Sequence, residues 1–253
     1  TSRGLGDVYK RQGVIEPNGQ AISDAVHAAG GLSLVGIDPI SLGVLATPPT
    51  YGADIVCGDL QPLGIHMFYG GGQSGFMATT DDEKFVMEFP SRLFGIAPTS
   101  EPGEYGFGDV AYDRTSFGHH REHGKEYVGT QSALWGITAG VYLATMGPQG
   151  MAEVDELIMA NAQYAAKKLS EIPGIKVNPF GSVFFKEFVI DFTETGKTVE
   201  EINKALLAKG IFGGKDLSKE FPNLGQSALY CVTEVHMKED LDTLAAAIAE
   251  VIK

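Results

Sequence analysis

The chain has 253 residues, of which 43% are hydrophobic and 20% are charged, a composition that can support a folded core. Its net charge of −13 makes nucleic acid and anionic membrane surfaces poor partners, because an acidic surface repels both. No long uncharged apolar run and no signal-peptide pattern is present, so we predict no membrane span. Cys57 and Cys231 each lie in an apolar, strand-like run, which favours buried thiols in a cytoplasmic protein over a disulfide.

The first twelve residues, TSRGLGDVYKRQ, have no apolar period and no initiator methionine. The stretch DVYKRQ resembles the translation of a transposon end used in preparing sequencing libraries. We interpret residues 1–12 as a sequencing artefact or a disordered terminus. If they are an artefact, the natural protein is longer and this chain is an N-terminally truncated fragment that lacks part of its first domain.

Helical and strand-like segments alternate along the first part of the chain. The patterns predict a helix over 20–30, strands over 32–37 and 53–57, a short helix or turn over 41–45, and apolar runs over 63–69 and 76–80. Short buried strands that each end on Asp, Gly or Pro indicate an α/β sheet with functional residues at the strand ends.

Residues 88–118 are rich in glycine and proline and predict an irregular segment, either a functional loop or an interface arm. Residues 131–146 form a largely apolar helical pattern closed by Gly147-Pro148, which we expect to be buried between layers or subunits. Beyond it, the expected elements are helices over 151–172, 199–207 and 241–251 and strands over 183–192 and 228–232. The predicted organisation is therefore a large domain over 13–150 and a small α/β domain over 151–253.

A glycine-rich loop joins the two apolar runs, and its residues 70–75 spell G-x-G-x-x-G. A dinucleotide-binding fingerprint needs a helix directly after these glycines, because the helix N-terminus holds the pyrophosphate. The residues after Gly75 read instead as a strand. We therefore favour a glycine-rich hairpin whose backbone passes close to another group over a Rossmann-type site.

Several polar residues have both a structural and a functional interpretation. Asp38, just past a buried strand, fits a helix cap better than a cofactor ligand. Thr130, at the start of the apolar helix, can act as a cap, an anion contact or both. A cluster near residue 120 lacks further ligands with zinc spacing, so we predict a polar loop and no metal site for His119, His120, Glu122 and His123. The sequence contains no G-x-S-x-G elbow, and neither cysteine lies in an electropositive setting.

Several motifs occur together in the chain: YGADIV, PLGI followed by GG and GF, and GGKDLS, in that order, with QSALWGITAGVYLATMGPQGMAEV before the last of them. Through these motifs the chain resembles, from Gly13 to Lys253, the decarboxylating glycine dehydrogenases, the P-protein family of the glycine cleavage system. It is closest to subunit 1, which is a separate chain in many bacteria and archaea. The family implies an α/β fold of the fold-type I pyridoxal-phosphate transferases, here the C-terminal part of the large domain followed by the small C-terminal domain.

In such enzymes the lysine that binds the coenzyme aldehyde lies just before a glycine-rich stretch. Pro62 stands in that register here, and Lys84 and Lys125 do not occupy it. The resemblance therefore implies a subunit that has no catalytic residue of its own. It also places Asp38 at the position that pairs with the pyridine nitrogen in active members, where without an anchored coenzyme it would serve only as a cap.

The resemblance implies that subunit 2 carries the lysine and the pyridoxal phosphate, in a heterotetramer of two plus two. The pair would decarboxylate glycine and pass the aminomethyl group to the lipoyl H-protein. Possible contacts of this chain to the partner's coenzyme are Thr130, Gly70, Gly71 and Gly72. Two alternatives stay open: a free-standing, aminotransferase-like pyridoxal-phosphate enzyme, and a non-enzymatic scaffold of the same fold.

Overall fold

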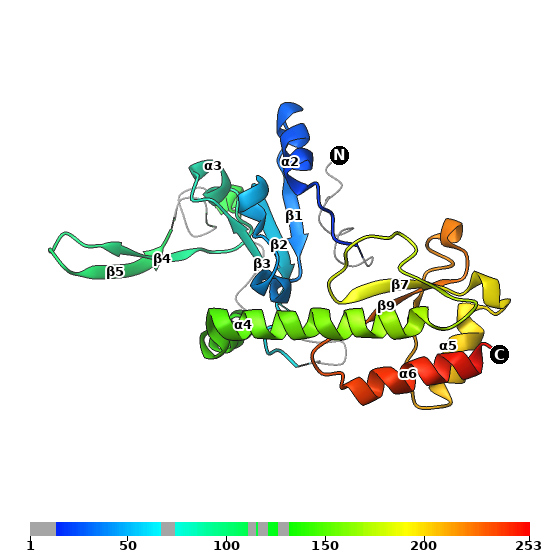
Figure 1. Cartoon of the computed structure of the whole chain (residues 1–253). Coiled ribbons are helices and arrows are strands. Elements are labelled where there is room, and N and C mark those ends of the chain that lie inside the picture. The colour runs from blue at the N-terminus through cyan, green and yellow to red at the C-terminus, as the bar shows by residue number, and fades with distance from the viewer. Residues whose placement is uncertain (1–13, 67–73, 111–114, 116–120, 126–131) are drawn as a thin grey trace.

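The computed structural model describes residues 14–66, 74–110, 115, 121–125 and 132–253. Within these ranges, mixed α/β elements form two regions that share the long helix α4, Ala133–Ser170 (Figure 1). In the described part of the chain, no helix is both long enough and apolar enough to cross a membrane.

The first region is built around a three-stranded sheet in the order β1-β2-β3. Strands β1 and β2 are parallel, and β3 runs antiparallel to β2. The elements are α2 (Gly19–Ala28), β1 (Leu34–Ile37), the 3-10 helices η1 (Pro39–Gly43) and η2 (Pro48–Tyr51), β2 (Ile55–Asp59), β3 (Gly75–Thr79) and α3 (Glu83–Val86). The helix, strand and short-helix predictions for this part of the chain are confirmed. Gly75 opens a strand and not a helix, which contradicts the Rossmann-type interpretation.

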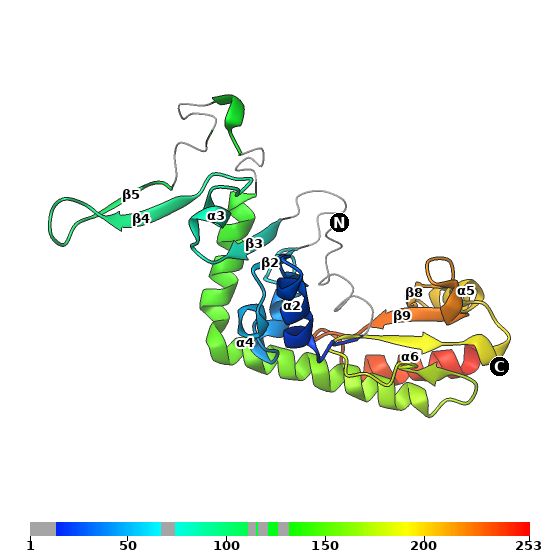
Figure 2. The ribbon, with the colours of Figure 1, turned by 90° about the horizontal axis from the view of Figure 1, so that it is seen from above.

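The segment predicted to be irregular contains a β-hairpin. Strand β4 (Phe94–Pro98) pairs antiparallel with β5 (Tyr105–Asp109), and the short 3-10 helix η4 (Arg121–His123) follows. The prediction of irregular structure is therefore wrong for 94–109. Gly95, Gly106 and Gly108, which suggested breaks, lie inside the two strands. The hairpin extends away from the rest of the molecule in both views (Figures 1 and 2).

Helix α4 bends at Gly147, where the backbone leaves the helical region (φ 62°, ψ 178°) and Pro148 begins the second straight stretch. Figure 2 shows the two stretches meeting at an angle. In the first stretch Ala139 is buried, but Leu134, Ile137 and Val141 are each more than 60% exposed. Burial between layers of this chain is therefore wrong for that face, and burial between subunits stays a prediction.

The second region is a four-stranded antiparallel sheet in the order β6-β7-β9-β8. Its strands are β6 (Lys176–Val177), β7 (Glu187–Asp191), β8 (Lys215–Asp216) and β9 (Ser227–Cys231); its other elements are η5 (Thr193–Thr195), α5 (Val199–Leu207), η6 (Pro222–Leu224) and α6 (Lys238–Val251). The long strands and helices match the sequence predictions, whereas the two-residue edge strands were not predicted. Helix α5 opens on a capping box between Thr198 and Glu201.

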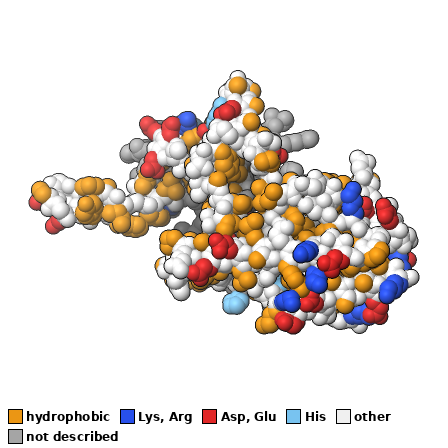
Figure 3. All heavy atoms as spheres, in the orientation of Figure 1, with side chains coloured by type: hydrophobic (Ala, Val, Ile, Leu, Met, Phe, Trp, Pro, Cys, Tyr) orange, Lys and Arg blue, Asp and Glu red, His pale blue; other side chains and the backbone are white. Residues whose placement is uncertain are grey.

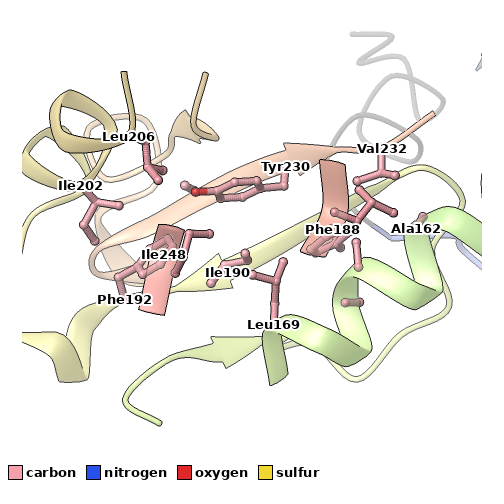
Figure 4. Close-up of a cluster of buried hydrophobic side chains, with 14 of the residues drawn as sticks. Ala162, Leu169, Phe188, Ile190, Phe192, Ile202, Leu206, Tyr230, Val232 and Ile248 are labelled. Atoms are coloured by element: carbon pink, nitrogen blue, oxygen red, sulfur yellow. The ribbon is translucent and has the colours of Figure 1, made fainter. Parts of the chain in front are cut away.

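The main hydrophobic core lies between this second sheet and helices α4, α5 and α6 (Figure 4). Phe188 is fully buried at its centre, with the Phe184 ring 5.3 Å away and the Tyr230 ring 6.4 Å away between centroids. Side chains alternate along β9, so Tyr230 points inward and Cys231 outward. Cys231 is exposed and Cys57 is half-buried, so the prediction of buried thiols is wrong; both are free thiols.

A second, smaller hydrophobic cluster joins the first region to α4. It contains Ile40, Leu63, Ala139, Met151, Ile158 and Phe185. The predicted domain boundary at residue 150 falls inside α4, three residues after the bend. Helix α4 contributes to the packing of both regions and therefore does not mark a boundary between them. The division into domains over 13–150 and 151–253 stays a proposal.

Candidate functional site

The candidate site lies at the carboxyl edge of the first sheet, where β1 and β2 end side by side. Ile37, the last residue of β1, pairs with Gly58, so Asp38 directly after β1 and Asp59 at the end of β2 lie at the same edge of two neighbouring parallel strands. The two backbones approach closely here: a Cβ on Gly58 would lie 2.4 Å from the carbonyl oxygen of Ile37. Strand β3 pairs antiparallel with β2, so that Asp59 lies opposite Gly75.

Asp38 caps the short helix η1. Its carboxylate accepts a hydrogen bond from the backbone N–H of Ile40 at 3.3 Å, and its own carbonyl accepts one from the Ser41 hydroxyl at 2.7 Å. Pro39 occupies the first position of η1, where its missing N–H costs nothing. The predicted capping role of Asp38 is confirmed.

Asp38 has a second partner that was not predicted, the ammonium of Lys186, with which it forms an ion pair. The two side chains are only 15% and 19% exposed, and Lys186 directly precedes strand β7 of the second sheet. The expectation that Asp38 serves only as a cap is therefore wrong. The ion pair ties the carboxyl edge of the first sheet to the beginning of the second.

The protonation of Lys186 is set by two opposing effects. Burial on its own lowers the pKa of the ammonium, but the Asp38 carboxylate overcomes this and raises the pKa above its ordinary value of 10.5. The side chain is consequently a cation at neutral pH, with no free electron pair to attack a carbonyl. A single lysine inside the run VFFKEFVID was the sequence signal for this group, because a charge in a buried strand needs a partner.

The register in which the resemblance expects an anchoring lysine holds Pro62. The turn around it is fixed by Asp59, whose carboxylate accepts the Gln61 N–H at 2.7 Å, and by burial of Leu63 and Ile65. Pro62 offers no amine. The two other lysines considered form surface ion pairs: Lys84 with Asp82 at 3.2 Å and Lys125 with Glu88 at 2.8 Å.

These residues do not fit a covalently anchored pyridoxal phosphate on this chain. Covalent anchoring needs an uncharged amine near the aldehyde, and holding the pyridine nitrogen needs an available carboxylate. Pro62 supplies no amine, and the carboxylate of Asp38 is already paired with the Lys186 ammonium. The chain's own described residues thus do not make a complete coenzyme site.

A buried carboxylate on α4 holds the end of η1, the short helix that Asp38 caps. Asp155 is fully buried, and its carboxylate accepts the backbone N–H of Gly43 at 2.6 Å. Gly43 is required there, because a Cβ would lie 2.5 Å from that carboxylate and 2.6 Å from the carbonyl oxygen of Met151. This contact fixes the end of η1 against α4. The sequence signal for it was a carboxylate among the apolar positions of residues 151–169, because a buried charge needs a partner.

The predicted coenzyme contacts Gly70, Gly71, Gly72 and Thr130 lie outside the described residues, as do His119 and His120. Glu122 and His123 are exposed. Among the residues that the structure describes, no three histidine, cysteine or acidic side chains are grouped as metal ligands would be.

Comparison with known proteins places this arrangement in a family. Residues 7–248 match the family model described as glycine cleavage system P-protein. A probable glycine dehydrogenase (decarboxylating) subunit 1 of Staphylothermus marinus is 39% identical over 95% of this chain and 50% of its own length. The chain thus spans about half the length of the curated relatives that it matches.

Solved structures agree. A crystal structure of glycine decarboxylase (P-protein) of the glycine cleavage system, in inhibitor-bound form, is 35% identical, with a TM-score of 0.81 over 92% of this chain and 51% of that one. A sphingosine-1-phosphate lyase of Burkholderia pseudomallei shares the fold at 15% identity, with a TM-score of 0.64 over 96% of this chain and 50% of the lyase. The α/β fold is that of the fold-type I pyridoxal-phosphate enzymes, as expected. The chain belongs to the glycine cleavage system P-protein family and is similar to its subunit 1.

Proposed function

We propose that the protein carrying this chain is a subunit of glycine dehydrogenase, and that a partner, subunit 2, supplies the catalytic lysine. Together they decarboxylate glycine and transfer the aminomethyl group to a lipoyl H-protein. The proposal rests on membership of the P-protein family and on the similarity to subunit 1 proteins. We further propose a heterotetramer of two plus two in the cytoplasm.

The proposal that the partner supplies the lysine rests on the residues at the carboxyl edge of the first sheet. Pro62 lacks an amine, and Lys186 is a protonated partner of Asp38. Pyridoxal phosphate bound on the partner would stabilise the electron pair left on the glycine carbon when carbon dioxide leaves. This chain's part is to complete and orient the shared site and to exclude water from it.

Glycine–bicarbonate exchange tests the proposal. We expect exchange in the presence of H-protein only when the protein carrying this chain is combined with a candidate subunit 2, because neither alone has both halves of the site. Each protein assayed alone is the control. Exchange by this protein alone would overturn the division of labour, and no exchange by the pair would leave the scaffold alternative standing.

The free-standing enzyme alternative makes a different prediction in the same preparation. It requires an amine on this chain that binds the coenzyme covalently. Incubation of the isolated protein with pyridoxal phosphate, followed by borohydride reduction and peptide mapping, would then label a lysine of this chain. Labelled Lys186 would identify the group and refute the proposal.

Thr130, Gly70, Gly71 and Gly72 are proposed to contact the phosphate of the partner's coenzyme. We expect Thr130→Ala to weaken coenzyme affinity of the reconstituted pair roughly tenfold, since one hydrogen bond to a charged group is lost. Titration of the coenzyme-free pair, followed by absorbance, measures this. The matched control is Thr138→Ala. It removes a hydroxyl on α4 that donates to the Leu134 carbonyl at 3.0 Å. Unchanged affinity of Thr130→Ala would refute the contact.

A further inference from the structure

The hairpin formed by β4 and β5, called here the arm (residues 94–109), has no visible support from the rest of the described chain. Its strands form a sheet of two, and no other strand among the described residues pairs with them. It projects from the molecule in both ribbon views (Figures 1 and 2). Because an isolated two-stranded hairpin is at best marginally stable in water, the arm needs contacts from elsewhere to be held in this form.

One face of the arm is apolar. Ile96 lies opposite Phe107, and Pro98 lies opposite Tyr105, so these side chains share a face. Phe94 joins them by stacking on Phe107, with ring centroids 5.6 Å apart. Exposure is 72% for Ile96 and Phe107, 70% for Tyr105 and 50% for Phe94.

This exposed surface is large for a single structural element. A buried aromatic side chain removes on the order of 150–250 Å² from water, so the three rings of the arm leave on the order of 400 Å² uncovered. That equals the largest apolar patch of a typical monomer, and patches of this size mark interaction sites. The apolar face therefore fits a protein partner better than solvent.

The opposite face of the arm carries only small residues. Gly95 lies opposite Gly108, and Ala97 lies opposite Gly106. The chain itself does not require glycine at position 108, because a Cβ there would meet nothing within 4 Å. Glycine weakens a strand, and a strand glycine without an internal reason indicates close approach by another backbone.

The charge of the arm restricts the partner. Residues 93–110 contain no lysine or arginine, and the turn carries Glu101 and Glu104. At the root, Arg92 forms an ion pair with Asp109. Figure 3 shows apolar side chains along the arm and acidic ones at its outer end. A second copy of this chain, with its net charge of −13, would bring like charges together, whereas a basic surface would be complementary.

We propose that the arm docks on the second subunit of the enzyme, with its apolar face in an apolar groove rimmed by lysine or arginine side chains. The small-residue face lies against backbone of the same partner. The proposal rests on the proposed function for the identity of that partner. It specifies that the arm makes the contact and that an apolar groove with a basic rim on subunit 2 receives the arm.

Affinity of arm variants for subunit 2 tests the apolar face. We expect Ile96→Ser and Phe107→Ser each to weaken binding by roughly tenfold to a hundredfold, as for central apolar anchors of an interface. Leu207→Ser is the matched control: Leu207 is 55% exposed on α5, at the opposite end of the molecule from the arm (Figure 1). Equal affinity of the arm variants and the control would overturn the proposal.

Gly108→Val tests the small-residue face independently of hairpin folding. Valine favours strands and has open space at this position, so the hairpin itself should not be weakened. We expect the valine side chain nevertheless to lower affinity for subunit 2 at least tenfold by holding the two backbones apart. Unchanged affinity would refute close approach on this face.

Hydrogen exchange of the arm distinguishes which surface covers it: subunit 2, the protein's own chain or a second copy. In the protein carrying this chain, we expect the amides of 94–109 to exchange fast alone and slowly after subunit 2 is added, with binding weakened by added salt. Slow exchange in the isolated protein would assign the arm to the protein's own remaining chain, and dimerisation lost in Phe107→Ser would assign it to a second copy. Either outcome overturns the proposal.

The two proposals fail separately. If the wild-type pair performs glycine–bicarbonate exchange but the arm variants bind as tightly as wild type, the docking proposal is wrong and the proposed function stands. If the wild-type pair binds through the arm but performs no exchange, the proposed function is wrong and the docking surface stands.

Discussion

Lys186→Met is expected to destabilise the protein by about 3 kcal/mol, because it leaves the Asp38 carboxylate largely buried without its counter-charge. A loss of unfolding free energy of this size lowers the melting temperature by about 6–12 °C in a protein of this length. Thermal unfolding followed by circular dichroism measures it. The double variant Asp38→Asn with Lys186→Met should recover part of the loss, since no unpaired charge is then buried.

The matched control is Lys209→Met. Lys209 forms an ion pair with Glu250 at 2.8 Å on the surface, with the glutamate side chain 70% exposed. Its loss should leave the melting temperature nearly unchanged, because exposed pairs contribute little. An equally small change for Lys186→Met would show that the pair with Asp38 does not stabilise the junction of the two sheets.

The same pair gives a pH dependence whose sign follows from the raised pKa of Lys186. A cation whose pKa is higher in the folded protein stabilises the fold fully below its unfolded value, here the ordinary value of 10.5. That contribution is lost as the pH rises through the folded pKa. The difference in unfolding free energy between wild type and Lys186→Met should therefore be constant near neutral pH and should shrink in the alkaline range above 10.5.

Phe188→Ala is expected to cost about 3–5 kcal/mol, the range for truncating a fully buried aromatic side chain. Phe188 lies on β7, is 0% exposed and belongs to the core between the second sheet and its helices, with Phe184 and Tyr230 as ring neighbours (Figure 4). Removing the ring leaves a cavity that the surrounding buried side chains can fill only in part. Urea unfolding measures the loss as a lower transition midpoint.

Two further variants sharpen this measurement. Phe188→Leu keeps most of the apolar volume and should cost clearly less than the alanine variant. Phe212→Ala removes the same ring from a position that is 88% exposed, so its effect should be small. If Phe188→Ala and Phe212→Ala had equal midpoints, the second sheet and its helices would not share the core described here.

Apolar periodicity predicted most of the fold because burial on one face sets the spacing of residues. Helix α5 coincides with the predicted 199–207, and β9 lies within one residue of the predicted strand. The two strands of the arm were missed because they combine exposed aromatic residues with glycines, a pattern with no buried face to impose a period. For the helix face that carries Leu134, Ile137 and Val141, burial between layers of this chain was predicted wrongly, whereas burial between subunits stays a prediction. An apolar helix face does not say which chain covers it.

The candidate site was predictable only in part. The cap at Asp38 follows from local sequence, because an aspartate before Pro39 and Ser41 has its partners within three residues. Its ion pair with Lys186 joins positions almost 150 apart and depends on how the two sheets are placed. The contact between Gly43 and Asp155 is likewise long-range, so the sequence suggested the residues but not their partners.

The bend of α4 at Gly147 has a mechanical consequence. The bent helix carries Ala139 and Ile158 in the smaller cluster and Leu169 in the larger core, so the packing of the two clusters is linked through α4. At the bend the helix axis changes direction, while the helical stretches on both sides of Gly147 stay intact. We therefore expect a partner that displaces the exposed end near Leu134 to alter the packing around the second sheet as well.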